Sequence, residues 1–254
     1  MQILHNMNEH WKSKRNLLLA IEQFHQKALA EQRYASFDFC FLYFQTHRHS
    51  LVRNKELSCL HLWSYLASWG MLRGSSQLLQ ECSIKALSSV VEYLSLFPDS
   101  DWDLDLGVNE KGICDESKSR RIIQIFKDLR DIMSKGQKRK ASPTLITKIM
   151  LGTLGCVPAF DQYFTDAFRA EYKDTKCGFR SLTPKALMCI QNFYTENCEI
   201  INEIRYSVID FDNIKTRFTY TRAKLIDMYG FTIGFNEAKN NSKHNNHEKE
   251  HTQI

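Results

Sequence analysis

The stretch Leu145–Tyr172, LITKIMLGTLGCVPAFDQYFTDAFRAEY, predicts two helices joined by a tight turn that contains glycine. Apolar residues recur with helical spacing in its first part. Gly152 and Gly155 can adopt the positive φ that ends a helix, and Pro158 prevents the helix from continuing. A second helix is therefore expected to begin shortly after the proline.

Asp161 stands at the position where the N-cap of this second helix belongs. A carboxylate there accepts hydrogen bonds from the first free amides, and the helix dipole favours its ionised form. The stretch therefore predicts a fixed anion beside a glycine turn. Asp161 is either a structural N-cap or a carboxylate with a chemical role.

The rest of the chain favours an all-α protein. It has 254 residues, of which 43% are hydrophobic, and contains only ten glycines and four prolines. Helical periodicity dominates, although Phe37–Phe44 (FDFCFLYF) fits a buried helix or a strand. We expect a helical domain at residues 1–235, built as one compact unit or as two lobes divided near 97–117, with a cleft between them. The polar residues 236–254 cannot bury enough apolar area and are expected to be disordered.

Composition also narrows the location and the cofactors. The formal charge of +5 suits a polyanionic partner. Eight cysteines without a CxxC pair, and no signal peptide, favour a reducing cytoplasm. No apolar run reaches the roughly 20 residues that a membrane helix requires. No set of ligands has the spacing of a metal site, so we expect neither a metal nor another cofactor.

The segment Glu56–Leu72 (ELSCLHLWSYLASWGML) predicts a helix that is apolar nearly all round and therefore central in the core. Its large aromatic residues are Trp63, Tyr65 and Trp69. These three side chains are expected to carry much of the buried area of this helix.

Two basic features could bind phosphate. Arg73 follows the central helix and precedes Ser75-Ser76, a pair suited to capping the next helix, although a plain helix corner explains it equally. The strongest basic run is KGQKRK, which includes Lys138, Arg139 and Lys140 and comes just before the glycine-turn stretch. Phosphate backbones are held by such cations together with amides at helix ends.

A helix, a glycine turn and then Val-Pro-x-x-Asp at the start of another helix resemble the helix-hairpin-helix superfamily of DNA glycosylases. The match is confined to this stretch. The corresponding residues are Gly152, Thr153, Leu154 and Gly155 for the hairpin's G-x-x-G, Val157 and Pro158 for its V-P, and Asp161 for its acid.

This resemblance implies an enzyme that acts on double-stranded DNA. Gly152, Thr153 and Gly155, with Lys148, would grip the backbone. The flipped base would be sandwiched by aromatic rings, with Trp63, Tyr65 and Trp69 as the candidates. Asp161 would stabilise the positive charge that develops on the sugar when the base leaves. Lys148 precedes the turn, whereas strand-cutting members carry their lysine after it, so simple base excision is expected. The four C-terminal cysteines of the cluster-binding members are missing, so no iron–sulfur cluster is expected. The base would be damaged, in repair, or modified, as in phage DNA during antiviral defence.

Two other functions remain open. The chain could be a non-enzymatic helical interaction module of a bacterial defence or mobile-element system. Arg53 followed by His61 also imitates the catalytic pair of HEPN ribonucleases, although the interval is longer than usual and would turn the two side chains in different directions on one helix.

Overall fold

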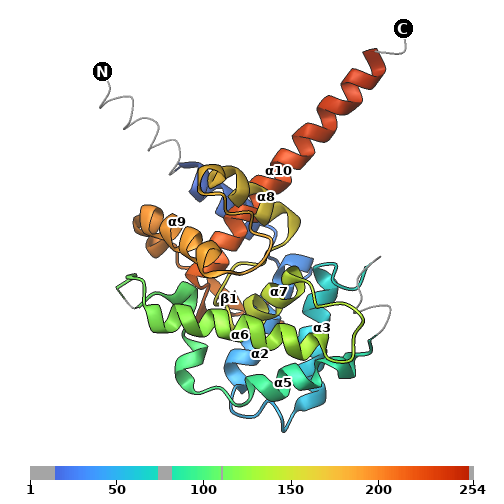
Figure 1. Cartoon of the computed structure of the whole chain (residues 1–254), viewed down its shortest axis with the longest axis vertical. Coiled ribbons are helices and arrows are strands. Elements are labelled where there is room, and N and C mark those ends of the chain that lie inside the picture. Colours follow the sequence, from blue (N-terminus) through green and yellow to red (C-terminus); the bar gives the residue numbers. More distant parts are fainter. Residues whose placement is uncertain (1–14, 74–81, 110, 252–254) are drawn as a thin grey trace.

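The structure is a computed structural model that describes residues 15–73, 82–109 and 111–251, with side chains described as far as residue 242 (Figure 1). Residues 15–25 are helical. The other α-helices are α2 (Ser36–His47), α3 (Lys55–Ser68), α5 (Ser88–Leu94), α6 (Glu116–Ser134), α7 (Pro143–Leu154), α8 (Gln162–Glu171), α9 (Pro184–Glu203) and α10 (Arg222–His251). Short 3₁₀ helices are η1 (Arg33–Ala35), η2 (Ile84–Leu87), η3 (Asp99–Trp102), η4 (Asp105–Gly107) and η5 (Lys173–Thr175), and the strands β1 (Ser207–Ile209) and β2 (Lys215–Thr219) form an antiparallel pair. The predicted all-α class is confirmed.

Helix α7 forms the centre of the core, and the predicted helix–turn–helix is confirmed. Residues 145–160 are all buried, and α7 contacts α2, α3 and α6. Ser142 caps the start of α7 by accepting from the Leu145 amide, and Gly155 ends it with a φ of 62°. Asp161 then caps α8 by accepting from the Phe164 amide at 3.1 Å. The local signals in the sequence therefore set both helix boundaries.

The segment at 97–117, where a division into lobes was considered, joins the common core. Leu104 and Leu106 are buried in an apolar cluster that also contains residues from α2 to α10. The carboxylate of Asp105 accepts from the amides of Arg222 and Ala223, each at 3.0 Å, and so caps α10. These contacts support a single compact unit.

Helices α8 and α10 pack closely because α10 presents glycine to α8. A Cβ on Gly230 would lie 2.5 Å from Cδ2 of the Phe164 ring, and a Cβ on Gly234 would overlap the backbone of Tyr163. Figure 1 shows the second half of α10 extending away from the other helices. The backbones of the two helices can therefore approach only where glycine is present.

Helix α10 runs into the polar segment that begins at residue 236. In the structure α10 continues through residues 236–251, and residues 236–242 are exposed. Adding residues to an existing helix avoids the unfavourable nucleation step, which the packed first half of α10 already provides. The tail therefore needs no buried face of its own to be helical.

Asp38 joins α2 to the small sheet. Its carboxylate accepts from the Ile209 amide at 3.0 Å and from the Tyr220 hydroxyl at 2.7 Å, and the side chain is buried. Burial raises the pKa of Asp38 to about 6, although both hydrogen bonds and Lys224 oppose this shift. The folded state therefore holds this proton more tightly than the unfolded chain does.

Asp38→Asn is expected to remove a pH dependence of stability. A carboxyl group with a raised pKa destabilises the fold increasingly as pH rises from about 4 to about 6, because the folded protein then binds more protons than the unfolded chain. The full effect is about 3 kcal/mol above that range. Urea unfolding of the wild type across this range should show the fall in stability, and Asp38→Asn should lack it. The exposed Asp212→Asn is the control, and an equal slope in Asp38→Asn would contradict the prediction.

Candidate functional site

A nearly buried ion pair links helix α7 to the start of α8. Lys148 Nζ lies 3.1 Å from Asp161 Oδ2, and the two side chains are 3% and 16% exposed, respectively. The other carboxylate oxygen of Asp161 accepts from the Phe164 amide. The carboxylate is therefore fixed by two elements, and the Asp161 side chain remains 16% exposed.

The turn between α7 and α8 holds this pair together. The Phe160 amide donates to Thr147 Oγ1 at 2.8 Å, and Thr144 Oγ1 donates to the Phe160 carbonyl at 2.7 Å. Both threonines belong to α7, so these hydrogen bonds fold the turn back along the helix. As a result Asp161, thirteen residues after Lys148 in the sequence, lies against it.

Aromatic rings border the ion pair. Lys148 Nζ is 4.9 Å from the ring centroid of Trp69. Trp69 lies 5.5 Å from Tyr34 and 5.6 Å from Phe231, and Phe231 lies 5.2 Å from Tyr163, all in edge-to-face geometry. Tyr34, Trp69 and Tyr163 are partly exposed. We call these four rings, with Phe235 beside Phe231, the aromatic cluster.

A second ion pair lies behind the first. Lys224 Nζ is 3.1 Å from Asp227 Oδ2, and the two side chains are 1% and 8% exposed. The ammonium lies over the rings of Phe24 and Phe37, at 4.4 and 4.6 Å. Burial lowers the pKa of Lys224, an effect that Asp227 opposes. The other oxygen of Asp227 accepts from the Ala159 amide, so this pair also fixes the turn before Asp161.

Three of the predicted site residues meet here, and two others do not. Asp161, Lys148 and Trp69 come together. Tyr65 is buried against α7, where a Cβ on Gly152 would overlap its ring, so Tyr65 packs two helices together and has no free face for a base. Trp63 is partly buried against the core and does not belong to the aromatic cluster. Of the three rings predicted to stack on a base, only Trp69 thus lies beside Lys148, and its ring also stacks on Phe24, with the centroids 6.1 Å apart.

The glycine turn has a structural role, which corrects the expected phosphate contacts. Gly152 and Thr153 lie inside α7, and Thr153 Oγ1 donates to the Ile149 carbonyl. The Gly155 amide donates to the carbonyls of Met150 and Leu151. All three predicted residues are buried, and Lys148 is engaged by Asp161, so neither amides nor ammonium are available to phosphate here.

The exposed cations keep their predicted role as a hypothesis. Lys138, Arg139 and Lys140 are exposed in the connection between α6 and α7. Arg73 is exposed, and its side chain folds back along the chain. Its Cδ lies 3.8 Å from the position that a Cβ on Gly70 would take, and Gly70 is the residue after Trp69. The serine pair that was expected to cap the following helix lies outside the described residues.

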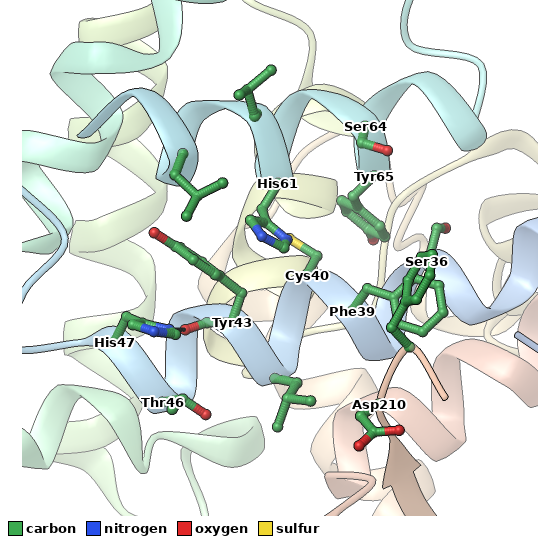
Figure 2. Close-up of a pocket in the computed structure, with 14 residues that line it drawn as sticks. Ser36, Phe39, Cys40, Tyr43, Thr46, His47, His61, Ser64, Tyr65 and Asp210 are labelled. Carbon is green, nitrogen blue, oxygen red and sulfur yellow. Dashed lines mark hydrogen bonds between the residues drawn. The ribbon is translucent and has the colours of Figure 1, made fainter. Parts of the chain in front are cut away.

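A separate apolar pocket of about 630 Å³ lies between α2 and α3 (Figure 2). His61 lines it and stacks on Tyr43, with the ring centroids 4.0 Å apart. Burial lowers the pKa of His61. Arg53 is exposed in the turn before α3 and is not among the lining residues, so the structure does not bring this pair together as a HEPN nuclease requires.

Sequence reasoning missed Lys224 and Asp227, because lysine is almost never fully buried unless it is paired, so a lysine on a helix is expected at the surface. The available signal was a Lys-x-x-Asp spacing inside the apolar run AKLIDMYG. Tyr34 and Arg33 were missed because nothing local marks them as neighbours of Trp69.

Within the described ranges, no group of three or more His, Cys, Asp or Glu side chains is arranged to hold a metal ion. Among the same residues, none of the helices combines the length and the apolar character that crossing a membrane requires. Comparison with protein-family models, with curated proteins and with solved structures finds no match for this chain.

Proposed function

We propose that the protein is a DNA glycosylase-like hydrolase that excises a damaged or modified base from double-stranded DNA. The observation that carries the proposal is the Asp161 carboxylate, which is held by Lys148 and the α8 amide, is 16% exposed, and lies beside a lysine that contacts the ring of Trp69. A carboxylate is costly beside a polyanion unless it takes part in the reaction.

In this proposal the target nucleotide leaves the base stack and its base lies against Trp69 and Tyr34. Breaking the N-glycosidic bond builds positive charge on the sugar. Asp161 stabilises that charge and orients the attacking water, as carboxylates do in other glycoside hydrolyses. The base is a damaged one in repair or a modified one in phage DNA.

Lys148 acts as a positioning residue for Asp161. Its side chain is 3% exposed, and its ammonium lies 3.1 Å from the carboxylate, which it fixes in position. The product is an abasic site, and the strand is cut only after alkali. Cleavage without alkali would instead point to attack by an amine, and Lys148 is the lysine nearest to Asp161 among the described contacts.

The DNA backbone is held by exposed cations rather than by the glycine turn. Lys138, Arg139 and Lys140 precede α7 and carry three charges in three residues. The cysteines are free thiols, which fits the reducing cytoplasm in which such an enzyme would meet DNA.

The test is incubation of the purified protein with duplexes that carry damaged or modified bases, followed by alkali and a denaturing gel. Alkali-dependent cleavage at the modified base supports the proposal. Absence of cleavage across a panel of oxidised, alkylated, deaminated and hypermodified bases would overturn it.

The apolar pocket favours a second function, a non-enzymatic helical interaction module. Leu57, Leu60 and Phe211 line this pocket, and they are 48%, 46% and 82% exposed. Clustered exposed apolar side chains mark interaction surfaces in soluble proteins. In Figure 2 the pocket follows the two helices, with His47 near one end and Asp210 near the other.

Leu60→Asp is expected to remove most of the binding of the apolar dye bis-ANS to the native protein, because it places a charge at the wall of the pocket. Fluorescence titration measures the effect. Leu96→Asp is the matched control, since Leu96 is 81% exposed and does not line this pocket. Equal dye binding by all three proteins would show that the pocket does not accept an apolar ligand.

A further inference from the structure

Arg33 is held by aromatic rings at the edge of the candidate site. Its guanidinium carbon lies 5.1 Å from the ring centroid of Tyr34 and 5.4 Å from that of Trp69. The residue is exposed, and within the described part of the chain no carboxylate lies within ion-pair distance of it. Stacking of this kind fixes the plane of a guanidinium and leaves its N–H groups free at the edge.

Lys27 is a second exposed cation that borders these rings. Its Nζ lies 5.8 Å from the centroids of both Tyr34 and Phe235. Arg73, also exposed, lies close to Gly70, the residue that follows Trp69. We call Lys27, Arg33 and Arg73 the cationic strip.

The local charge balance favours an anion at this strip. The Lys148–Asp161 and Lys224–Asp227 pairs are each neutral overall. By contrast, the strip adds Lys27, Arg33 and Arg73, and no ion pair to these three is present among the described residues. Arg169, by contrast, is exposed and paired with Asp166, whereas the contacts of Arg33 are with two rings.

We propose that Arg33, assisted by Lys27 and Arg73, is a phosphate-binding site that holds the backbone beside the nucleotide entering the Lys148–Asp161 site. This inference rests on the proposed function for the identity of the ligand as DNA. A fixed guanidinium donates two parallel N–H bonds to phosphate oxygens. Adjacent rings on which bases stack, next to cations that follow the backbone, are the general design of nucleic-acid strand binding.

The test measures binding separately from excision. The probe is a fluorescent duplex that contains a tetrahydrofuran abasic-site analogue, and its affinity is measured by anisotropy as salt is increased. Arg33→Gln is expected to reduce the slope of log affinity against log salt by about 0.9, which corresponds to a loss of about 5- to 10-fold near 0.1 M salt. Arg33→Lys keeps the charge and should retain the slope.

Arg217→Gln is the matched control, because Arg217 is also exposed and lies 5.0 Å from the centroid of an aromatic ring, that of Phe218, on β2 away from the candidate site. It should leave the slope unchanged. Circular dichroism and thermal unfolding establish that each variant is folded before its affinity is compared.

The outcomes separate this inference from the proposed function. Equal slopes for wild type, Arg33→Gln and Arg217→Gln, together with excision by the wild type, would overturn the phosphate site and leave the function standing. A reduced slope in Arg33→Gln alone, with no excision of any base, would support the phosphate site and overturn the glycosylase proposal. Failure of the wild type to bind the duplex would overturn both.

Discussion

Asp161→Asn is expected to lower the rate of base excision by about 10²–10³-fold, the loss seen when a group that stabilises transition-state charge is removed. Asparagine is as good an N-cap as aspartate, so the hydrogen bond from the Phe164 amide should survive. The substitution therefore removes the negative charge and keeps the local backbone. A single-turnover assay on the substrate that the wild type cleaves measures the effect.

Loss of stability must be separated from loss of chemistry, because Asp161→Asn leaves the buried Lys148 ammonium without its partner. The double variant Lys148→Met/Asp161→Asn removes both charges and should recover much of the stability. It should not recover excision. If the double variant excised the base at the wild-type rate, Asp161 would be only the N-cap of α8, and another group would have to stabilise the charge on the sugar.

Lys148→Met alone is the informative companion. In the proposed mechanism it should slow excision less than Asp161→Asn does, since the carboxylate remains and is partly solvated. A larger loss in Lys148→Met than in Asp161→Asn would contradict its assignment as a positioning residue and would favour direct attack by the amine.

The part of the site that the sequence predicts is the part encoded locally. Ser142-Pro143 begins α7, Gly155 ends it and Asp161 begins α8, and each of these signals acts within a few residues. Such signals depend on backbone geometry and capping hydrogen bonds. The tertiary contacts of the folded protein leave these helix ends where the local sequence puts them. The helix boundaries in this stretch could therefore be derived before the fold was known.

The contacts that give the site its chemistry are not local. Trp69, Tyr34 and Phe231 contact one another although they come from three segments that are far apart in the sequence. Asp161 reaches Lys148 only because hydrogen bonds from two threonines fold the turn back along α7. Periodicity shows that a residue faces a core, but it does not show which neighbour it meets there. The glycines illustrate this limit, because Gly152 was read as part of a turn and instead admits the ring of Tyr65 between helices.

The small sheet and helix α2 show the same limit at the level of secondary structure. Strands β1 and β2 have only three and five residues, and alternation over so few residues is not distinctive. The run Phe37–Phe44 was compatible with helix or strand, and it is helical in α2, where it packs against α3 and α7. Tertiary packing decided what the pattern left open.

The second large effect concerns stability: Asp227→Asn is expected to destabilise the protein by about 3–5 kcal/mol, because it leaves the Lys224 ammonium buried without a counter-charge. The amide oxygen of asparagine can still accept from the Ala159 amide, so the turn keeps that hydrogen bond. Urea unfolding near neutral pH measures the loss. Asp166→Asn is the matched control, since Asp166 also pairs with a cation three residues away but both side chains are about half exposed. Its effect should be below about 1 kcal/mol.

The pH dependence identifies the cause. Burial lowers the pKa of Lys224, and Asp227 raises it. Removing the Asp227 carboxylate therefore lowers the pKa of Lys224 further below the ordinary 10.5. The unfolded chain then binds a proton that the folded protein does not, and stability rises with pH wherever this holds. Asp227→Asn should therefore recover stability relative to the wild type as pH is raised from neutral towards 10.5. The double variant Lys224→Met/Asp227→Asn should be close to the wild type in stability and lack this recovery. If the double variant were as unstable as Asp227→Asn alone, the loss would come from the altered contacts of the turn, and the buried charge would not be its cause.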